Sequence, residues 1–292
     1  MSSPRVTVII ATYNWSSVLP YAINSVLAQT MPDFELLVVG DGCTDDSEQV
    51  VGAVTDPRVR WINLPANSGH QAGPNNRGLA EARGEFIAYL GHDDLWLRHH
   101  LQCTTDALDN SGAAIAHSLL MSMLPGKEVG MPVVPIQGVG SAPSCSVYRR
   151  SVTEKIGGWR DYRKLSLPSE VEIFQRARAA GFEAIFVPRL TVVKFPALHR
   201  KDVYRDKPFH EQAAWLERIH SDPDFEPTWL ARMITSDEAI RALPARKLIR
   251  ILAQELKSRM AWRLTPRSGH KAILWTAKGA GVDLQKKYKG VE

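Results

Sequence analysis

Hydrophobic residues in the first ninety positions form two alternating kinds of segment. Residues 6–11 form a nearly continuous apolar run rich in β-branched residues, and strand-like runs also occupy residues 34–39, 59–63 and 86–90. Between them apolar residues recur at helical spacing, as at Leu19, Ile23 and Val26. Nearly continuous apolar runs are typical of strands buried on both faces of a parallel sheet. The alternation therefore predicts an α/β fold, with a mostly parallel central sheet flanked by helices.

The polar residues that follow these strands are expected to lie on one rim of the sheet. Residues 12–14, 40–45 and 91–94 each come directly after an apolar run. Ligands of parallel sheets bind beyond the carboxyl ends of the strands. We therefore expect the functional residues of this protein to lie on this rim.

The pattern changes in the later part of the chain. Helices are expected near residues 98–110 and 170–180, and strands near 113–121, 144–148, 184–187 and 191–195. Ser16 is expected to cap the first helix, and Thr44 or Asp45 the second. Beyond Pro196 the spacing is helical throughout. This shift divides the chain into a first domain over residues 1–200 and a basic helical extension over residues 201–292.

Composition narrows the class of protein. The 292 residues carry a formal net charge of +5, and residues 241–292 hold 13 Lys or Arg against three acids. Such a tail suggests an anionic partner, and a membrane surface is favoured over nucleic acid because no base-reading motif is present. Packing of the tail on the catalytic domain is the simpler alternative. Three widely spaced cysteines and the absence of a signal-peptide pattern indicate a cytoplasmic protein.

The acids of the rim allow two interpretations. Asp41, Asp93 and Asp94 follow strands, and carboxylates in this position suit a hard divalent cation that also holds substrate phosphates. Asp93 and Asp94 equally suit the capping of a following helix or turn. Their spacing alone leaves both interpretations open. The chain has no G-x-G-x-x-G or Walker-type loop, which argues against a dinucleotide dehydrogenase or a P-loop kinase.

Several stretches in fixed order resemble a known family. They are VTVIIATYN (6–14), SVLAQT (25–30), FELLVVGDGCTDDS (34–47), NSGHQAGPNNRGLAEARGEFIAYLGHDDLW (67–96) and GGWRD (157–161). Together they look like the family 2 glycosyltransferases with the GT-A fold, over roughly residues 5–195. The resemblance implies an inverting transfer of a sugar from a nucleotide diphosphate donor, with Mn²⁺ or Mg²⁺ as cofactor, and we expect the donor to be UDP-linked.

The resemblance also assigns roles to individual positions. Asp93 matches the metal-binding Asp of the family's D-x-D motif, and His199 is a further candidate ligand. Arg200 and Lys201 are candidates to clamp the diphosphate. The positions matched to the nucleotide-sugar site are Thr12, Tyr13, Asn14, Asp41, Asn67, Gly69 and Asp94.

A general base is also required, because removal of the acceptor proton assists attack on the anomeric carbon. Glu170 aligns with the family's base, and Glu172 is the nearest alternative. Both acids also suit the first turn of a helix, where the helix dipole stabilises negative charge.

The departures from the family pattern lie at the same rim. Gly40 and Gly91 stand where the family usually has an acid, and Asn75 stands where it usually has a cation. His92 is a candidate to compensate as a ligand. The expected function is transfer to a saccharide or lipid-linked acceptor in cell-surface polysaccharide synthesis. The competing hypothesis is a nucleotide- or saccharide-binding module on the same fold, weakened in catalysis by these losses.

Overall fold

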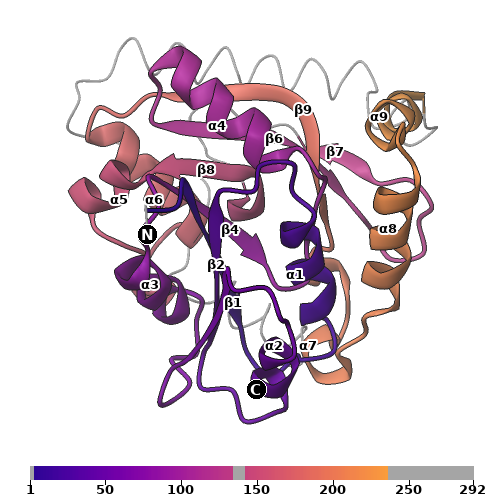
Figure 1. Ribbon diagram of the computed structural model, residues 1–292, viewed down its shortest axis with the longest axis horizontal. Coiled ribbons are helices and arrows are strands. Elements are labelled where there is room, and N and C mark those ends of the chain that lie inside the picture. Colours follow the sequence, from indigo (N-terminus) through magenta and orange to yellow (C-terminus); the bar gives the residue numbers. More distant parts are fainter. Residues whose placement is uncertain (1–2, 134–141, 236–292) are drawn as a thin grey trace.

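The computed structural model describes residues 3–133 and 142–235 (Figure 1). The strands are β1 Val6–Thr12, β2 Phe34–Gly40, β3 Val59–Asn63, β4 Phe86–Gly91, β5 Leu95–Trp96, β6 Ile115–Ser122, β7 Met131–Val133, β8 Ser146–Arg149 and β9 Ala184–Lys194. The α-helices are α1 Leu19–Leu27, α2 Ser47–Gly52, α3 Ala72–Glu81, α4 His100–Ser111, α5 Arg150–Ile156, α6 Ser169–Ala179, α7 Val203–Asp206, α8 His210–Ser221 and α9 Phe225–Thr235. Short 3-10 helices are η1 Pro143–Cys145, η2 Tyr162–Lys164 and η3 Ala197–His199.

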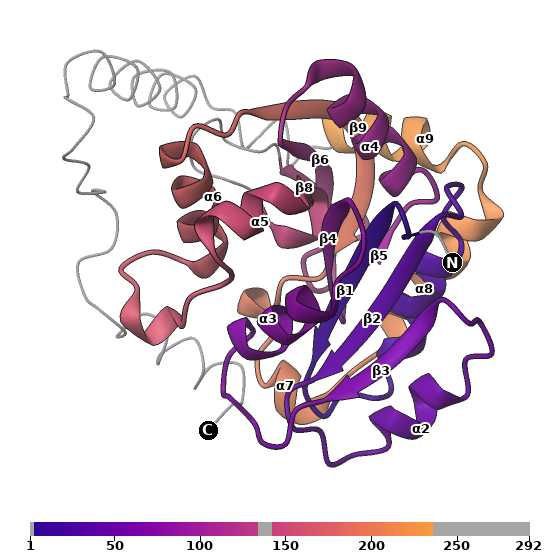
Figure 2. The same ribbon diagram turned by 60° about the vertical axis from the view of Figure 1, so that its left-hand side comes forward.

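All of these strands belong to one sheet, in the order β3-β2-β1-β4-β8-β6-β9-β5, with β7 paired to β6. The first four strands in this order are parallel, as the sequence predicts. Thr12 pairs with Gly40, and Ala11 pairs with Gly91. The carboxyl ends of β1, β2 and β4 therefore meet at one edge, which confirms the predicted rim (Figure 2).

Alternate residues of the parallel strands pack into separate hydrophobic cores on the two faces of the sheet. On β1, Val8 and Ile10 belong to the core that contains residues of α1, α2 and α4, whereas Ile9 belongs to the core that contains residues of α3 and α6. Figures 1 and 2 show helices on both faces. Burial on both faces explains why these strands contain almost only apolar residues.

The second half of the sheet differs from the expectation in detail. Residues 184–187 and 191–195 were expected to form two strands, but β9 runs through both and pairs with β6 with register shifts near Ser118 and Leu119. Helix α5 was not predicted. The predicted cap by Ser16 is wrong, because Val18 precedes α1 and no side-chain hydrogen bond caps that helix. Asp45 does bind the first turn of α2, accepting hydrogen bonds from the backbone and side chain of Ser47.

Helices α8 and α9 pack against the far strands of the sheet. Trp215 and Trp229 share a core with Leu95 of β5 and Val193 of β9. Residues 201–235 therefore pack closely onto the sheet, while the basic segment 241–292 lies outside the described residues. The division of the chain at residue 200 stays a prediction.

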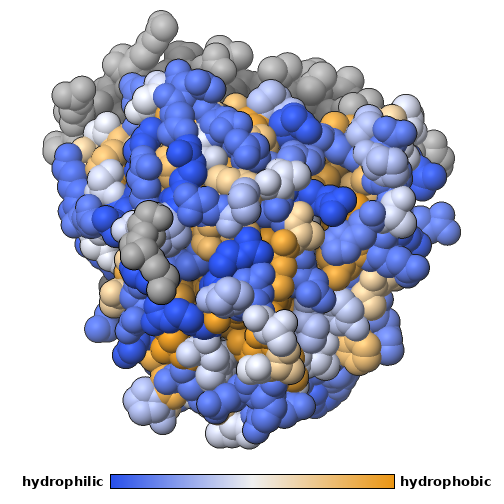
Figure 3. Space-filling model, viewed as in Figure 1, coloured by the Kyte–Doolittle hydropathy of each residue, from blue (hydrophilic) through white to orange (hydrophobic). Residues whose placement is uncertain are grey.

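The surface gives no sign of a spanning segment in the described part of the chain. No helix within residues 3–133 and 142–235 is long and apolar enough to cross a membrane. Figure 3 shows one face, on which hydrophilic residues surround smaller hydrophobic areas.

Candidate functional site

The rim of the sheet begins with a pair of side chains from neighbouring strands. His92, just after β4, lies with its Nδ1 3.0 Å from the Thr12 hydroxyl at the end of β1. Its ring also contacts Trp15 and Tyr204 in edge-to-face arrangements. Burial lowers the pKa of His92, which favours the neutral imidazole. His92 is thus a hydrogen-bonding partner of Thr12 on the rim.

Asp41 lies one residue beyond β2 and is almost fully buried. Its Oδ1 accepts hydrogen bonds from the backbone N–H of Ser68, at 3.0 Å, and from the Ser68 hydroxyl, at 2.7 Å. Ser68 belongs to the loop that also contains Asn67 and Gly69. Asp41 therefore fixes the loop that was predicted to flank the nucleotide, with Oδ1 facing that loop.

The predicted nucleotide residues lie close together around this loop. Asn14 has a left-handed backbone with φ of 46°, and its Oδ1 accepts hydrogen bonds from the backbone of Thr44 and Asp45. The side chain of Asn14 therefore shapes the turn after β2. Tyr13 is 43% exposed, and Asn67 and Gly69 are exposed as well. The contacts of these residues with a nucleotide stay predictions.

Asp94 is fully buried and bound on all sides. Its Oδ2 accepts hydrogen bonds from the Ser144 hydroxyl at 2.5 Å and from the Lys194 ammonium at 2.7 Å. Its Oδ1 accepts a hydrogen bond from the backbone N–H of Phe195 at 3.1 Å. Ser144 also accepts a hydrogen bond from the backbone N–H of Gly91. Asp94 thus ties the ends of β4 and β9 together, and its capacity for a further ligand is small.

Asp93 differs from its neighbour. No hydrogen bond to its carboxylate from another side chain is found within the described residues. Burial, together with the negative charge of Asp94, raises the pKa of Asp93. A cavity of about 160 Å³ adjoins Asp93 and is lined also by Trp15, Phe195 and Gln212. Asp93 is therefore the rim carboxylate of this pair that is free to meet a ligand.

Lys194 was missed by sequence reasoning. It is the last residue of β9, and its ammonium interacts electrostatically with Asp94, Asp93 and Glu170. Burial alone would lower the pKa of Lys194, but these three carboxylates raise it above its ordinary value. The signal available in the sequence was a single cation in the apolar stretch TVVKF. A pairing across 100 positions cannot be deduced from that stretch alone.

The two glycines that replace family acids are enclosed by neighbouring side chains. A Cβ on Gly91 would lie 2.8 Å from Asp94 Oδ2 and 3.2 Å from Asp93 Oδ1. A Cβ on Gly40 would lie 2.5 Å from Asn63 Oδ1 and 2.7 Å from the Trp61 ring. The present packing leaves no room for an acid at either position.

The residues around Asp93 fit a divalent cation poorly. Within residues 3–133 and 142–235, no group of three or more His, Cys, Asp or Glu side chains is placed to hold a metal. The predicted ligand His199 is exposed on η3, and no contact joins it to Asp93 in this part of the chain. The oxygens of Asp94 are taken by Ser144, Lys194 and Phe195. Asp93 is left as the free protein carboxylate at this position.

The anion clamp at Arg200 stays a prediction: the side chain lines the cavity beside Asp93, but its guanidinium already has partners. Arg200 is 8% exposed, and its guanidinium binds Glu211 and the carbonyl oxygens of Met123 and Pro196. Its hydrogen bonds hold the segment after β9 against α8. Arg200 is therefore engaged inside the protein.

The two base candidates on α6 have different surroundings. Glu172 is 9% exposed, and its Oε1 accepts hydrogen bonds from Arg160 at 3.0 Å and Arg176 at 2.7 Å. Glu170 is partly exposed in the first turn, and no hydrogen-bond partner for its carboxylate is found in the described residues. Glu172 joins α6 to the GGWRD loop, whereas Glu170 is available to a substrate.

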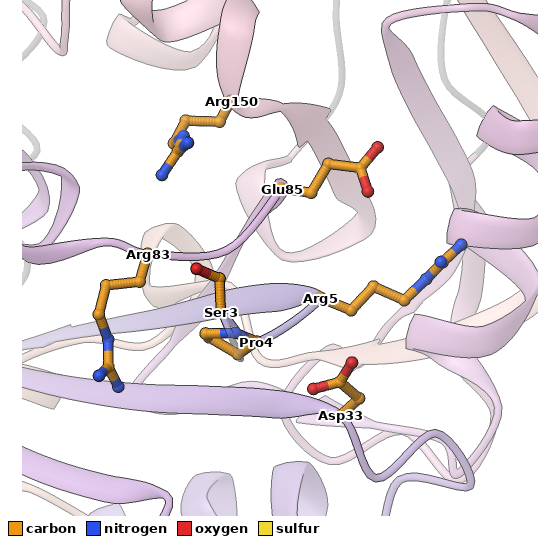
Figure 4. A pocket seen from close by; sticks show the side chains of 7 residues that line it. All are labelled: Ser3, Pro4, Arg5, Asp33, Arg83, Glu85 and Arg150. Carbon is orange, nitrogen blue, oxygen red and sulfur yellow. The ribbon is translucent and has the colours of Figure 1, made fainter. Parts of the chain in front are cut away.

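A second hollow lies at the opposite end of the strands (Figure 4). It has a volume of about 380 Å³ and is lined by Ser3, Pro4, Arg5, Asp33, Arg83, Glu85 and Arg150. Its arginines are paired with acids: Arg5 with Asp109, Arg83 with Glu35 and Arg150 with Glu154. Because it adjoins the amino ends of β1 and β4, it is not part of the rim.

The fold and the rim define an α/β protein with a mixed central sheet and a polar rim at the carboxyl ends of its parallel strands. Residues 7–122 match the model of the family named glycosyl transferase family 2. An uncharacterized glycosyltransferase of Nostoc sp., alr2836, is 35% identical over 173 residues, which are 52% of this chain and 53% of that protein. WfgD of Escherichia coli, named a UDP-Glc:alpha-D-GlcNAc-diphosphoundecaprenol beta-1,3-glucosyltransferase, is 35% identical over 102 residues, 35% of this chain and 40% of its own.

Among solved structures, the mannosyltransferase PcManGT from Pyrobaculum calidifontis, in complex with GDP-Man and Mn²⁺, has a TM-score of 0.55 at 18% identity. That match covers 100% of this chain and 86% of the other. The likeness shows the fold, which is GT-A. Residues 7–122 thus resemble glycosyl transferase family 2, and the chain spans about half the length, or less, of the two curated relatives.

Proposed function

We propose that this chain transfers a sugar, with inversion, from a nucleoside diphosphate sugar to a saccharide or lipid-linked acceptor in cell-surface polysaccharide synthesis. The observation that carries the proposal is the carboxyl-end rim, where Lys194 is hydrogen-bonded to Asp94 and the neighbouring Asp93 lines a cavity. The negative charges of Asp93 and Glu170 also help to raise the pKa of Lys194, which supports placing all three in one site. The family of the domain and the names of its relatives support the reaction class.

In the proposed reaction Glu170 acts as the general base. The acceptor hydroxyl attacks the anomeric carbon, and its proton passes to the Glu170 carboxylate. The new bond joins the acceptor oxygen to the anomeric carbon. The bond from that carbon to the diphosphate oxygen breaks, and its electron pair leaves with the nucleoside diphosphate. Inversion follows because attack and departure occur on opposite faces of the sugar.

The donor is placed along the rim. Thr12, Tyr13, Asp41 and the loop at residues 67–69 surround the proposed nucleoside position, and a UDP-linked donor is supported by the name of WfgD. The diphosphate and sugar then lie toward Asp93. No step is assigned to Mn²⁺ or Mg²⁺, because the residues around Asp93 form a poor donor set. We further propose a cytoplasmic location with peripheral membrane contact through residues 241–292, supported by their 13 basic residues.

Turnover of nucleotide sugars tests this proposal. Purified full-length chain is given UDP-, GDP- and dTDP-linked sugars with saccharide and lipid-linked acceptors, and released nucleotide is measured. Glu170→Gln is expected to lower kcat by about 10²- to 10⁴-fold, the usual contribution of a general base. Glu172→Gln is the matched comparison on the same helix, and it is expected to weaken folding more than turnover. A larger loss of kcat in a folded Glu172→Gln protein would transfer the role of base to Glu172.

The competing function, a binding module on the same fold, gives a different result. Such a module binds a nucleoside diphosphate yet releases none from any donor in the panel. Binding without turnover would therefore favour the module and reject the transferase.

A further inference from the structure

The rim contains a positively charged side chain, that of Lys194. Lys194 Nζ donates one hydrogen bond to Asp94, over 2.7 Å. An ammonium group has three N–H donors, and no acceptor for the other two is found within the described residues. The Lys194 side chain is 28% exposed, whereas Asp94 is 0% exposed. The ammonium is therefore anchored by Asp94 with two of its donors unused, and the side chain as a whole keeps part of its surface accessible.

The accessible side of Lys194 belongs to the same site as the reacting groups. Its ammonium is held by Asp94, the residue next to Asp93 in the turn after β4. The negative charges of Asp93 and of the proposed base Glu170 also contribute to raising the pKa of Lys194. These residues come from β9, from the turn after β4 and from the start of α6. A donor sugar whose anomeric carbon lies near Glu170 brings its diphosphate within the field of Lys194.

The same position is unfavourable for a divalent cation. Of the two carboxylates in the turn after β4, Asp94 is already bound and Asp93 is left for a ligand, and Gly91 has no room for a further acid. A divalent ion there would also be repelled by the neighbouring ammonium of Lys194. Lysine ammonium groups bind phosphate oxygens as point charges.

We propose that Lys194, anchored by Asp94, supplies the cationic contact to the donor diphosphate, so that the chain binds a nucleoside diphosphate without a divalent cation. This inference rests on the proposed function. Lys194 neutralises the charge on the departing diphosphate, and Asp94 acts as a positioning residue for it. Asp93 then faces the sugar as a hydrogen-bond acceptor.

Calorimetric titration with UDP, GDP and dTDP tests the proposal. For the nucleotide that binds, the wild-type Kd is expected to agree within about twofold between excess EDTA and excess Mn²⁺, since the contact needs no metal. Lys194→Met is expected to weaken binding in EDTA by about 10- to 100-fold, the usual effect of losing a charged hydrogen bond. Lys194→Arg should retain much of the affinity. Lys155→Met, which removes a cation bound to the Ala180 carbonyl, should leave it unchanged.

Folding of each variant is checked by circular dichroism. If Lys194→Met does not fold because Asp94 loses its partner, the double variant Asp94→Asn/Lys194→Met is titrated in its place. Binding by the wild type that requires Mn²⁺ overturns the inference while leaving the proposed function intact, and so does full metal-free affinity in the folded Lys194 variant. Failure of every nucleotide to bind in both conditions rejects the proposed function itself.

Discussion

The substitution Asp94→Asn should destabilise the fold, because Asp94 is the fully buried partner of Lys194. Asn has nearly the same shape, and its amide oxygen can still accept the hydrogen bond from the Phe195 backbone. The amide –NH₂, however, would face the donating ammonium of Lys194. The substitution therefore removes a charge-assisted hydrogen bond and leaves a largely enclosed cation without its counter-charge.

The burial of the Asp94–Lys194 pair sets the expected loss in the free energy of unfolding. Removing one member of a buried ion pair costs about 3–5 kcal/mol. The Lys194 side chain is 28% exposed, so water compensates part of the lost interaction. We therefore expect Asp94→Asn to lower the free energy of unfolding by about 3 kcal/mol, the low end of that range. Combining it with Lys194→Met removes the unpaired charge, and the two effects should be coupled by about 1–3 kcal/mol.

Urea unfolding at neutral pH measures these differences, followed by tryptophan fluorescence and far-ultraviolet circular dichroism together. Asp93→Asn is the control, since the adjacent carboxylate has no hydrogen bond from another described side chain. The pKa of Asp93 is raised in the folded protein, so its ionisation at neutral pH opposes folding, and Asp93→Asn should leave stability unchanged or increase it. A loss below about 1 kcal/mol in Asp94→Asn, or additive effects in the double variant, would refute the role given to this pair.

Two further predictions concern other parts of the sheet. Gly91→Asp restores the family's acid, but its Cβ would meet the bound carboxylate of Asp94. We therefore expect this substitution to destabilise the fold by about 1–3 kcal/mol and to create no Mn²⁺ site. A stable variant that binds Mn²⁺ in a titration would contradict this expectation. Glu35 is buried, which raises its pKa, but hydrogen bonds from Arg83 and Thr7 outweigh burial and leave the pKa lowered. Its stabilising effect is therefore present above the ordinary carboxyl pKa and is lost as pH falls through the lowered value, so Glu35→Gln should cost about 1–2 kcal/mol at pH 7 and less in acid. Urea midpoints at both pH values measure this difference, and an equal cost at both would be inconsistent with it.

The pattern of apolar residues along the sequence was sufficient to predict the first half of the fold. The apolar runs at β1, β2 and β4 predicted a parallel sheet, since strands covered on both faces consist mostly of apolar residues. The rim followed from topology, because parallel strands place their carboxyl ends at one edge. This reasoning predicted that Asp41, Asp93 and Asp94 lie on one rim of the sheet. It also distinguished Glu170 and Glu172 as the acids of one helix.

Tertiary structure decided what each of these acids can do. Asp93 and Asp94 are adjacent and chemically identical in sequence, yet Asp94 is enclosed by Ser144 and Lys194 while Asp93 remains free. Their partners come from 50 and 100 positions away, a separation that no local periodicity encodes. The same is true of Glu172, whose burial against Arg160 separates it from Glu170. Sequence alone determined where charge gathers, and long-range packing decided which charges are bound inside the protein and which can meet a ligand.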